Sequence, residues 1–418
     1  MDRRDFLAAV SLMMAAWSDG AGREDPAAPA ASKDTAQAKG QTAGQTAGRR
    51  FKRWFYGCGS DPERNARELK AAGLDAVVGV PADAVNKVTE AGLEAWLCGG
   101  AFGTAKTDAA SLARDLDGQA RYWFGSGSPN SPVLRDRCLK NYENMAATPG
   151  ITGIFVDGCR FASPASGWDA LFTDFSEHSR IRAEQLGMDW EVMVRDMRVL
   201  RDLLRQASAG PPPEALRMPL RAVETLVRLP GVVLWLRFRR ACINEQFRAI
   251  ARVIHGAGLR MGVYVFTPAL APLVGQDYAV LMELADVVSP MLYRNYAEAP
   301  GIACLNWELA ALAAPWGGPG DASAGEQWLE AAVDLLNWSE VVSERDPGRV
   351  REALPPALVG LETARARQVP GRAELAPIIN IADPAMAETV AAVRQAGADG
   401  VGWYLFRDDW KQWVGGVS

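Results

Sequence analysis

Short apolar runs alternate with helix-like segments along most of this chain, and this alternation limits the possible folds more than any other feature. From Phe51 onward, eight runs have the length and composition of buried β-strands. They are nearly continuous in apolar residues, as expected for parallel strands that are covered on both faces. In chain order they read RWFYGCG, LDAVVGVP, LEAWLCGGAFG, ITGIFVDGCRF, LRMGVYVFTP, DVVSPMLY, ALVGLETA and DGVGWYLF.

The segments between these runs have helical periodicity, and several end in Ala-Gly, as at Ala72-Gly73 and Ala257-Gly258. Glycine ends a helix readily because it adopts left-handed backbone angles without steric cost. Strands that alternate with helices indicate a parallel sheet. Eight such units over about 365 residues predict an α/β fold, a (β/α)₈ TIM barrel with insertions, because the typical barrel has about 250 residues. The alternative is a doubly wound open sheet, but no G-x-G-x-x-G opens a helix after the first strand.

Two segments are predicted to be helical and loop insertions after strands three and four. Leu116 to Pro132 contains the turn-rich sequence RYWFGSGSPNSP. Ala162 to Leu234 has mostly helical periodicity and is broken by AGPPPE. Both follow strand ends, which places them at the face where barrel enzymes carry their active sites.

The N-terminal residues predict export rather than a folded element. Residues 1–17 contain Arg3 and Arg4, then Phe6-Leu7 and a short apolar run, and resemble a bacterial twin-arginine signal. This run, about 12 residues long, is too short to cross a bilayer as a helix. Residues 18–50 are rich in Ala, Gly, Pro, Ser and Thr and predict a disordered linker. We therefore expect an extracytoplasmic protein, periplasmic or secreted, that meets the twin-arginine translocation machinery and whose folded domain spans 51–418.

Composition excludes several functional classes. The net charge of −5 gives no reason to expect nucleic acid as a partner, and the rest of the chain has no transmembrane stretch. The chain has six cysteines without a C-x-x-C pair and only two histidines, so we predict no metal site and no cofactor. Free thiols and disulfides both remain open for the six cysteines.

Two carboxylates are expected at strand ends. Asp157 ends the fourth run, and Glu362 ends the seventh run. The carboxyl ends of barrel strands meet at one mouth, where chemistry is placed, and a buried carboxylate there is costly unless it is paired. Arg160 is the nearest partner for Asp157. One alternative is a structural ion pair in which Arg160 and Asp157 hold the loop. The other is that Asp157 is an acid, base or nucleophile whose ionisation Arg160 tunes.

A family resemblance appears at these motifs. GIFVDGCRF, FTPALAPLVGQDYAVLMELADVVSPMLYRNY and GVGWYLF resemble the barrel of bacterial glycosyl-hydrolase-like families that are largely uncharacterised. The resemblance covers roughly Arg50 to Trp413. It implies that Asp157 is the leading catalytic carboxylate, with Arg160, Asp277 and Tyr293 nearby. Asp277 also has the position of a helix N-cap.

Glycoside hydrolysis needs two carboxylates that flank the bond and aromatic walls for the sugar, and the chain has 14 tryptophans. We therefore expect a glycosidase that acts on a poly- or oligosaccharide, with Asp157 and Glu362 catalytic. The substrate-binding residues are expected to be Arg160, Asp277, Tyr293, Asn295 and Trp403. The alternatives are a carbohydrate-binding barrel without catalysis, and a barrel lyase or isomerase.

Overall fold

A computed structural model describes residues 50–217, 219–297, 303–318 and 321–414. The predicted export signal and all of the predicted linker except Arg50 lie outside the described residues. Residues Lys52–Ser418 form one unit by their internal contacts. Within the described ranges, no helix combines the length and the apolar character that crossing a membrane requires.

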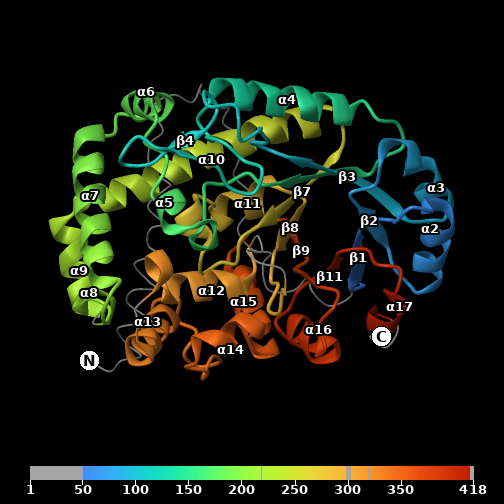
Figure 1. The fold of residues 1–418 in the computed structure, drawn as a ribbon. Coiled ribbons are helices and arrows are strands. Elements are labelled where there is room, and N and C mark those ends of the chain that lie inside the picture. The colour runs from blue at the N-terminus through green and yellow to red at the C-terminus, as the bar shows by residue number, and fades with distance from the viewer. Residues whose placement is uncertain (1–49, 218, 298–302, 319–320, 415–418) are drawn as a thin grey trace, which may run out of the picture. The chain divides into compact units, whose positions relative to one another are not determined.

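The centre of this unit is a curled parallel sheet (Figure 1). Its nine strands follow the order β10-β11-β1-β2-β3-β6-β7-β8-β9. The two outer strands, β9 and β10, are separated only by Ala376 and Pro377, and a parallel bridge also joins Met291 to Ile378. The strands are β1 (Lys52–Tyr56), β2 (Ala76–Val78), β3 (Glu94–Gly100), β6 (Gly153–Asp157), β7 (Arg260–Val265), β8 (Val287–Pro290), β9 (Glu374–Leu375), β10 (Ile378–Asn380) and β11 (Gly400–Tyr404).

Because β9 and β10 occupy one position in the ring, the sheet has the eight strand positions of a TIM barrel. The predicted barrel fold is therefore confirmed. The open doubly wound sheet is excluded, because the segment of β9 and β10 pairs with β8 and Met291 on one side and with β11 on the other.

The prediction of a strand at ALVGLETA is wrong, because this run lies in the helix α15 (Pro356–Gln368). Pro356 stands at the first helical position, where its fixed φ angle and missing N–H are tolerated. Ala, Leu, Glu and Arg, which favour helices, make up much of the rest. The seventh strand position belongs instead to ELAPIIN, the sequence of β9 and β10 with Pro377 between them.

Aromatic rings fill the interior of the barrel. The rings of Trp54, Trp96 and Phe155, from β1, β3 and β6, lie 5.3–5.9 Å apart between centroids and meet edge to face. Glycine at 262 makes room for them, because a Cβ there would lie 2.5 Å from the Phe155 ring. Side chains alternate across a strand, so every second residue from these positions also points inward.

Helices surround the barrel, and most of them begin with a proline or a capping side chain. The helices are α2 (Pro62–Ala71), α3 (Val85–Glu90), α4 (Pro132–Ala146), α5 (Trp168–Leu171), α6 (Glu177–Gln185), α7 (Trp190–Ala207), α8 (Glu214–Arg217), α9 (Pro219–Arg228), α10 (Pro230–Gly256), α11 (Tyr278–Leu284), α12 (Leu305–Ala313), α13 (Ala322–Leu335), α14 (Pro347–Glu352), α15, α16 (Met386–Gln395) and α17 (Lys411–Val414).

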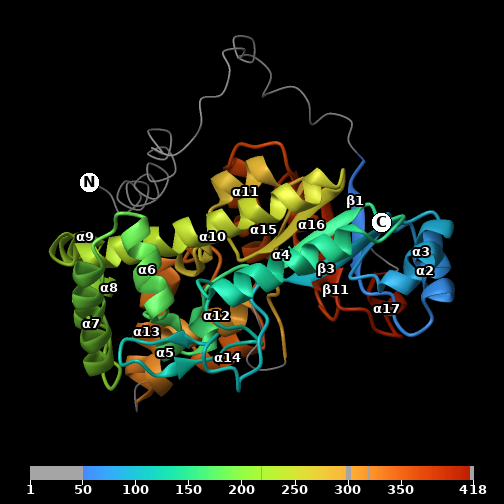
Figure 2. The ribbon, with the colours of Figure 1, turned by 90° about the horizontal axis from the view of Figure 1, so that it is seen from above.

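The connections after β3, β6 and β8 are the long ones, and the one after β8 carries α12 to α15. After β3 the chain forms a loop with the two-stranded hairpin β4 (Ala113–Arg114) and β5 (Ala120–Arg121) before α4. After β6 it forms α5 to α9 before the long helix α10, which returns to β7. Figure 2 shows α4 and α10 side by side, with α6 to α9 gathered at one end of α10.

Candidate active site

Asp157 points into the barrel at its C-terminal mouth. It is the last residue of β6 and comes two residues after Phe155, so it lies on the same, inward face of the strand. The Phe155 ring stacks on the ring of Tyr264 from β7, with 4.6 Å between centroids. Asp157 therefore lies one layer above the aromatic filling of the barrel, and it remains partly exposed.

Tyrosines from other strand ends surround this carboxyl. The Tyr56 ring, at the end of β1, lies 5.2 Å from the ring of Tyr404 and 6.0 Å from the ring of Tyr264. The Tyr293 ring, from the segment after β8, lies 5.2 Å from the ring of Tyr404. The negative charge of Asp157 raises the pKa of each of these four phenols, although burial is the larger cause. We call Asp157 and these four tyrosines the mouth cluster.

The pKa of Asp157 is raised above its ordinary value. Burial is the main cause, because it disfavours the charged carboxylate. Two smaller effects lower the pKa: a 2.7 Å hydrogen bond from the Gly158 main-chain N–H and the positive charge of Arg160. A carboxyl with a raised pKa keeps its proton to higher pH, which is what a general acid requires.

Arg160 is buried next to this site without neutralising Asp157 directly. Its guanidinium donates to the carbonyl of Phe161 at 3.1 Å and lies 4.8 Å from the centroid of the Phe266 ring. Among the described residues it forms no ion pair with Asp157 within 4.0 Å, and its Nε has no hydrogen-bond partner. The closed ion pair that would make Asp157 a purely structural residue is therefore not formed.

Glu308 is a second buried carboxyl near Arg160 that the sequence analysis missed. It lies in α12, accepts a hydrogen bond from the Ser163 hydroxyl at 2.7 Å and accepts another from the Ala165 main-chain N–H at 2.9 Å. Burial raises its pKa to about 7, against these hydrogen bonds and the charge of Arg160. The sequence does carry a signal, because Glu308 is the only charged residue in the apolar helix LNWELAALA.

Glu362 does not share the mouth with Asp157 as a strand-end residue, because it lies in α15 and is fully buried. Its carboxylate accepts hydrogen bonds from the Ala269 main-chain N–H at 3.0 Å and from Trp338 Nε1–H at 2.9 Å. Thr267 and Arg365 also donate to it. Thr267 and Ala269 connect α15 to the loop after β7, and Trp338 connects it to the segment after α13. We therefore leave Glu362 out of the candidate site.

The other expected residues divide between the mouth and the surrounding structure. Tyr293 lies in the mouth cluster. Asn295 donates from Nδ2 to the carbonyl of Ala382 at 3.0 Å, which connects the loops after β8 and β10. Asp277 caps α11 by accepting from the Ala279 main-chain N–H at 3.1 Å.

Trp403 lies in β11 but on the outer face of the barrel. It is fully buried, and its indole N–H donates to the sulfur of Met386 in α16 at 3.2 Å. Its neighbour Tyr404 takes the inward position instead.

Within the described part of the chain, no group of three or more His, Cys, Asp or Glu side chains could hold a metal ion. All six cysteines are described, and all are free thiols.

Family models and curated protein sequences give no match to this chain. Solved structures give fold-level similarity. The catalytic domain of β-amylase from Paenibacillus polymyxa is 12% identical with a TM-score of 0.45, over 85% of this chain and 92% of that one. A β-galactosidase from the psychrophilic Marinomonas ef1 is 14% identical with a TM-score of 0.47, over 85% of this chain and 54% of that one.

The glycoside hydrolase domain of PgaB (BpsB) from Bordetella bronchiseptica is also similar. It is 12% identical with a TM-score of 0.44, over 87% of this chain and 95% of that one. At these scores the similarity bears on neither substrate nor catalytic residues.

Proposed function

We propose that this protein is a glycoside hydrolase that acts on a poly- or oligosaccharide at the barrel mouth. The observation that supports it best is the mouth cluster: one inward carboxyl with a raised pKa, enclosed by tyrosines from four strand ends. Tyrosine rings offer apolar faces to the C–H groups of a sugar, and their hydroxyls offer hydrogen bonds to its O–H groups.

In this proposal Asp157 donates its proton to the oxygen of the scissile glycosidic bond. That oxygen leaves as a hydroxyl, water adds to the sugar carbon, and the proton that this water loses returns to the Asp157 carboxylate. Arg160 and Glu308 are positioning residues: the guanidinium lowers the pKa of both carboxyls, and Glu308 fixes the loop that carries Ser163 and Ala165.

A carbohydrate-binding barrel without catalysis is the second candidate function. It is favoured by the position of Glu362, because this carboxyl, which was expected to pair with Asp157, lies in α15 and accepts hydrogen bonds from four donors there and in neighbouring segments. The two candidates share the aromatic mouth and differ in whether bonds are broken there.

The test is a screen of the purified protein on a panel of polysaccharides, with reducing ends and bound sugar measured in parallel. A hydrolase releases reducing ends, and Asp157→Asn abolishes the release. Saturable binding without release, unchanged in Asp157→Asn, would support the binding protein and overturn the hydrolase. We further propose that the protein works outside the cytoplasm after twin-arginine export, on the basis of Arg3 and Arg4 in the N-terminal motif.

A further inference from the structure

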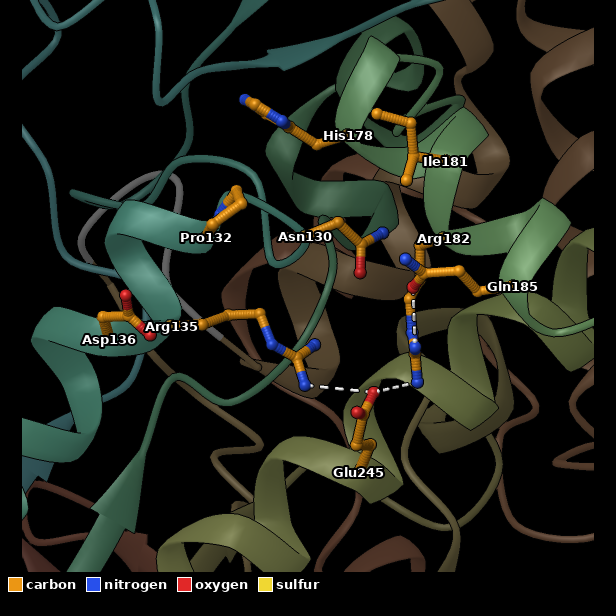
Figure 3. Close-up of a pocket in the computed structure, with 9 residues that line it drawn as sticks. All are labelled: Asn130, Pro132, Arg135, Asp136, His178, Ile181, Arg182, Gln185 and Glu245. Atoms are coloured by element: carbon orange, nitrogen blue, oxygen red, sulfur yellow. Dashed lines mark hydrogen bonds and ion pairs between the residues drawn. The ribbon is translucent and has the colours of Figure 1, made fainter. Parts of the chain in front are cut away.

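A polar pocket lies between α4, α6 and α10 and shares no residue with the mouth cluster (Figure 3). Its volume is about 270 Å³. Pockets for drug-sized ligands start at about 300 Å³, so this one suits a molecule of the size of a hydroxy acid or a single sugar ring.

Two arginines from different helices converge in this pocket on one carboxylate oxygen. Arg135 Nη2 lies 3.1 Å and Arg182 Nη2 lies 2.5 Å from Glu245 Oε2. Arginine presents planar N–H groups that match a carboxylate. Figure 3 shows Glu245 reaching up between the two guanidinium groups. This arrangement is therefore already shaped for a carboxylate, and Glu245, with 42% of its side chain exposed, can move into solvent.

A buried acceptor points into the same pocket. Asn130 is only 5% exposed, and its Oδ1 has no hydrogen-bond partner among the described residues. Figure 3 shows its amide pointing toward the space between Arg135 and Arg182. A buried acceptor without a partner destabilises the fold, so a ligand that donates a hydrogen bond to it would be favoured.

Neighbouring hydrogen bonds fix the orientation of this amide. The Ser179 hydroxyl donates to the carboxylate of Asp174 at 2.7 Å, so toward Asn130 it can only accept. Asn130 therefore turns Nδ2 toward Ser179, at 2.9 Å, and Oδ1 faces the other way. Arg182 Nε, which lines the same pocket, is a buried donor without a hydrogen-bond partner. The pocket therefore contains one acceptor and one donor that form no hydrogen bond among the described residues.

We propose that this pocket binds a small carboxylate that carries a neighbouring hydroxyl group. The carboxylate takes the place of Glu245 against Arg135 and Arg182. The hydroxyl donates to Asn130 Oδ1, which becomes reachable when Glu245 and the end of Arg182 shift. A free hydroxy acid and a uronic acid sugar both have this chemistry.

The test is calorimetric titration of the full chain with glycolate, D-glucuronate, acetate and ethylene glycol. We expect a preference for glycolate or glucuronate over acetate, and no binding of ethylene glycol. Tight binding of glucuronate alone would assign the site to sugar acids, and of glycolate alone to free hydroxy acids. Because Glu245 competes with the ligand, Glu245→Gln should tighten binding about tenfold, whereas Arg182→Gln should weaken it at least tenfold.

Arg180→Gln is the matched control, because Arg180 lies in the same helix and pairs with Glu177 and Glu184 rather than with Glu245. Its affinity should equal that of the wild type. The proposal is overturned if no ligand binds saturably, or if acetate binds with the same affinity as glycolate and glucuronate. It is also overturned if Glu245→Gln binds more weakly than the wild type, or if Arg180→Gln and Arg182→Gln lose equal affinity. The readout is binding, so it stands apart from any test of hydrolysis.

Discussion

The carboxyl group of Asp157 accepts a hydrogen bond of 2.7 Å from the main-chain N–H of Gly158, its own neighbour in sequence. This contact fixes the carboxyl at the end of β6 without neutralising it. Arg160 lowers the pKa of Asp157 only through its charge, and burial outweighs both effects. The fold therefore holds the ionised carboxylate at a cost in free energy, which is expected of a residue kept for chemistry rather than for stability.

Asp157→Asn should abolish hydrolysis and leave the fold as stable or more stable at neutral pH. A raised pKa means that the native state favours the protonated form, so ionisation of Asp157 destabilises the fold as pH rises through its pKa. The amide cannot ionise and removes this cost. We expect a fall in kcat/KM of about 10²–10⁴-fold, measured by reducing-end release beside thermal unfolding. Lower stability with retained activity would make Asp157 structural.

Tyr404→Ala should raise KM by about threefold to tenfold, because a ring contact contributes about 0.5–1.5 kcal/mol. Tyr404→Phe keeps the ring and should retain most of the affinity. Trp403→Phe is the matched control, since Trp403 is adjacent in β11 but packs against α16. It should lower stability and leave KM unchanged. Steady-state kinetics on the best polysaccharide measure both KM values. If Trp403 bound the sugar, Trp403→Phe would raise KM and Tyr404→Ala would leave it unchanged.

The barrel could be predicted because its strands and helices differ in local sequence pattern. The position of Asp157 at the end of a strand could be predicted because it directly follows an apolar run. Trp403 shows what local pattern misses. Side chains alternate across a strand, so an error of one residue moves a side chain to the other face. Tyr404, one residue later, is the residue that points inward. In β1 the same alternation places Tyr56, two residues after the inward Trp54, in the mouth cluster.

Glu308 and Glu362 could not be placed from sequence for a different reason. Their partners lie far away in the chain: Ser163 lies 145 residues from Glu308, and Thr267 lies 95 residues from Glu362. Glu362 was also misplaced because Ala357 to Ala364 is a short apolar run, which fits a strand or a helix equally well until the proline start is weighed.

Glu362→Ala should lower the free energy of unfolding and leave the catalytic rate of the folded protein unchanged. The substitution leaves the Trp338 and Ala269 donors unpaired in the interior and removes the carboxylate that forms the ion pair with Arg365. Removing one member of a buried charged pair costs about 3–5 kcal/mol. Urea unfolding measures this loss, and kcat per folded molecule at low temperature should stay near that of the wild type. A large fall in kcat with unchanged stability would return Glu362 to the catalytic pair.

Export offers a test of the N-terminal motif, which lies outside the described residues. Replacing Arg3 and Arg4 together with Lys should keep the protein in the cytoplasm, because the paired arginines are the feature that resembles a twin-arginine signal. Cell fractionation with an antibody against the folded domain measures the distribution. Replacement of Arg23 with Lys is the control and should leave export unchanged. Normal export of the double variant would refute the twin-arginine assignment.

The pKa of Glu308 predicts how stability depends on pH. The folded pKa of about 7 lies above the ordinary value of 4.5, so the native state binds this proton more tightly than the unfolded chain. The contribution of Glu308 to the free energy of unfolding is fully present below about pH 4.5. This contribution, on the order of 3 kcal/mol, is lost as the pH rises to about 7. Glu308→Gln imitates the protonated acid, since its amide can donate to Ser163 and accept from Ala165. Urea unfolding at pH 5 and pH 8 should therefore show a smaller difference in the variant than in the wild type. Equal differences would mean that Glu308 stays ionised throughout, with Arg160 compensating its charge.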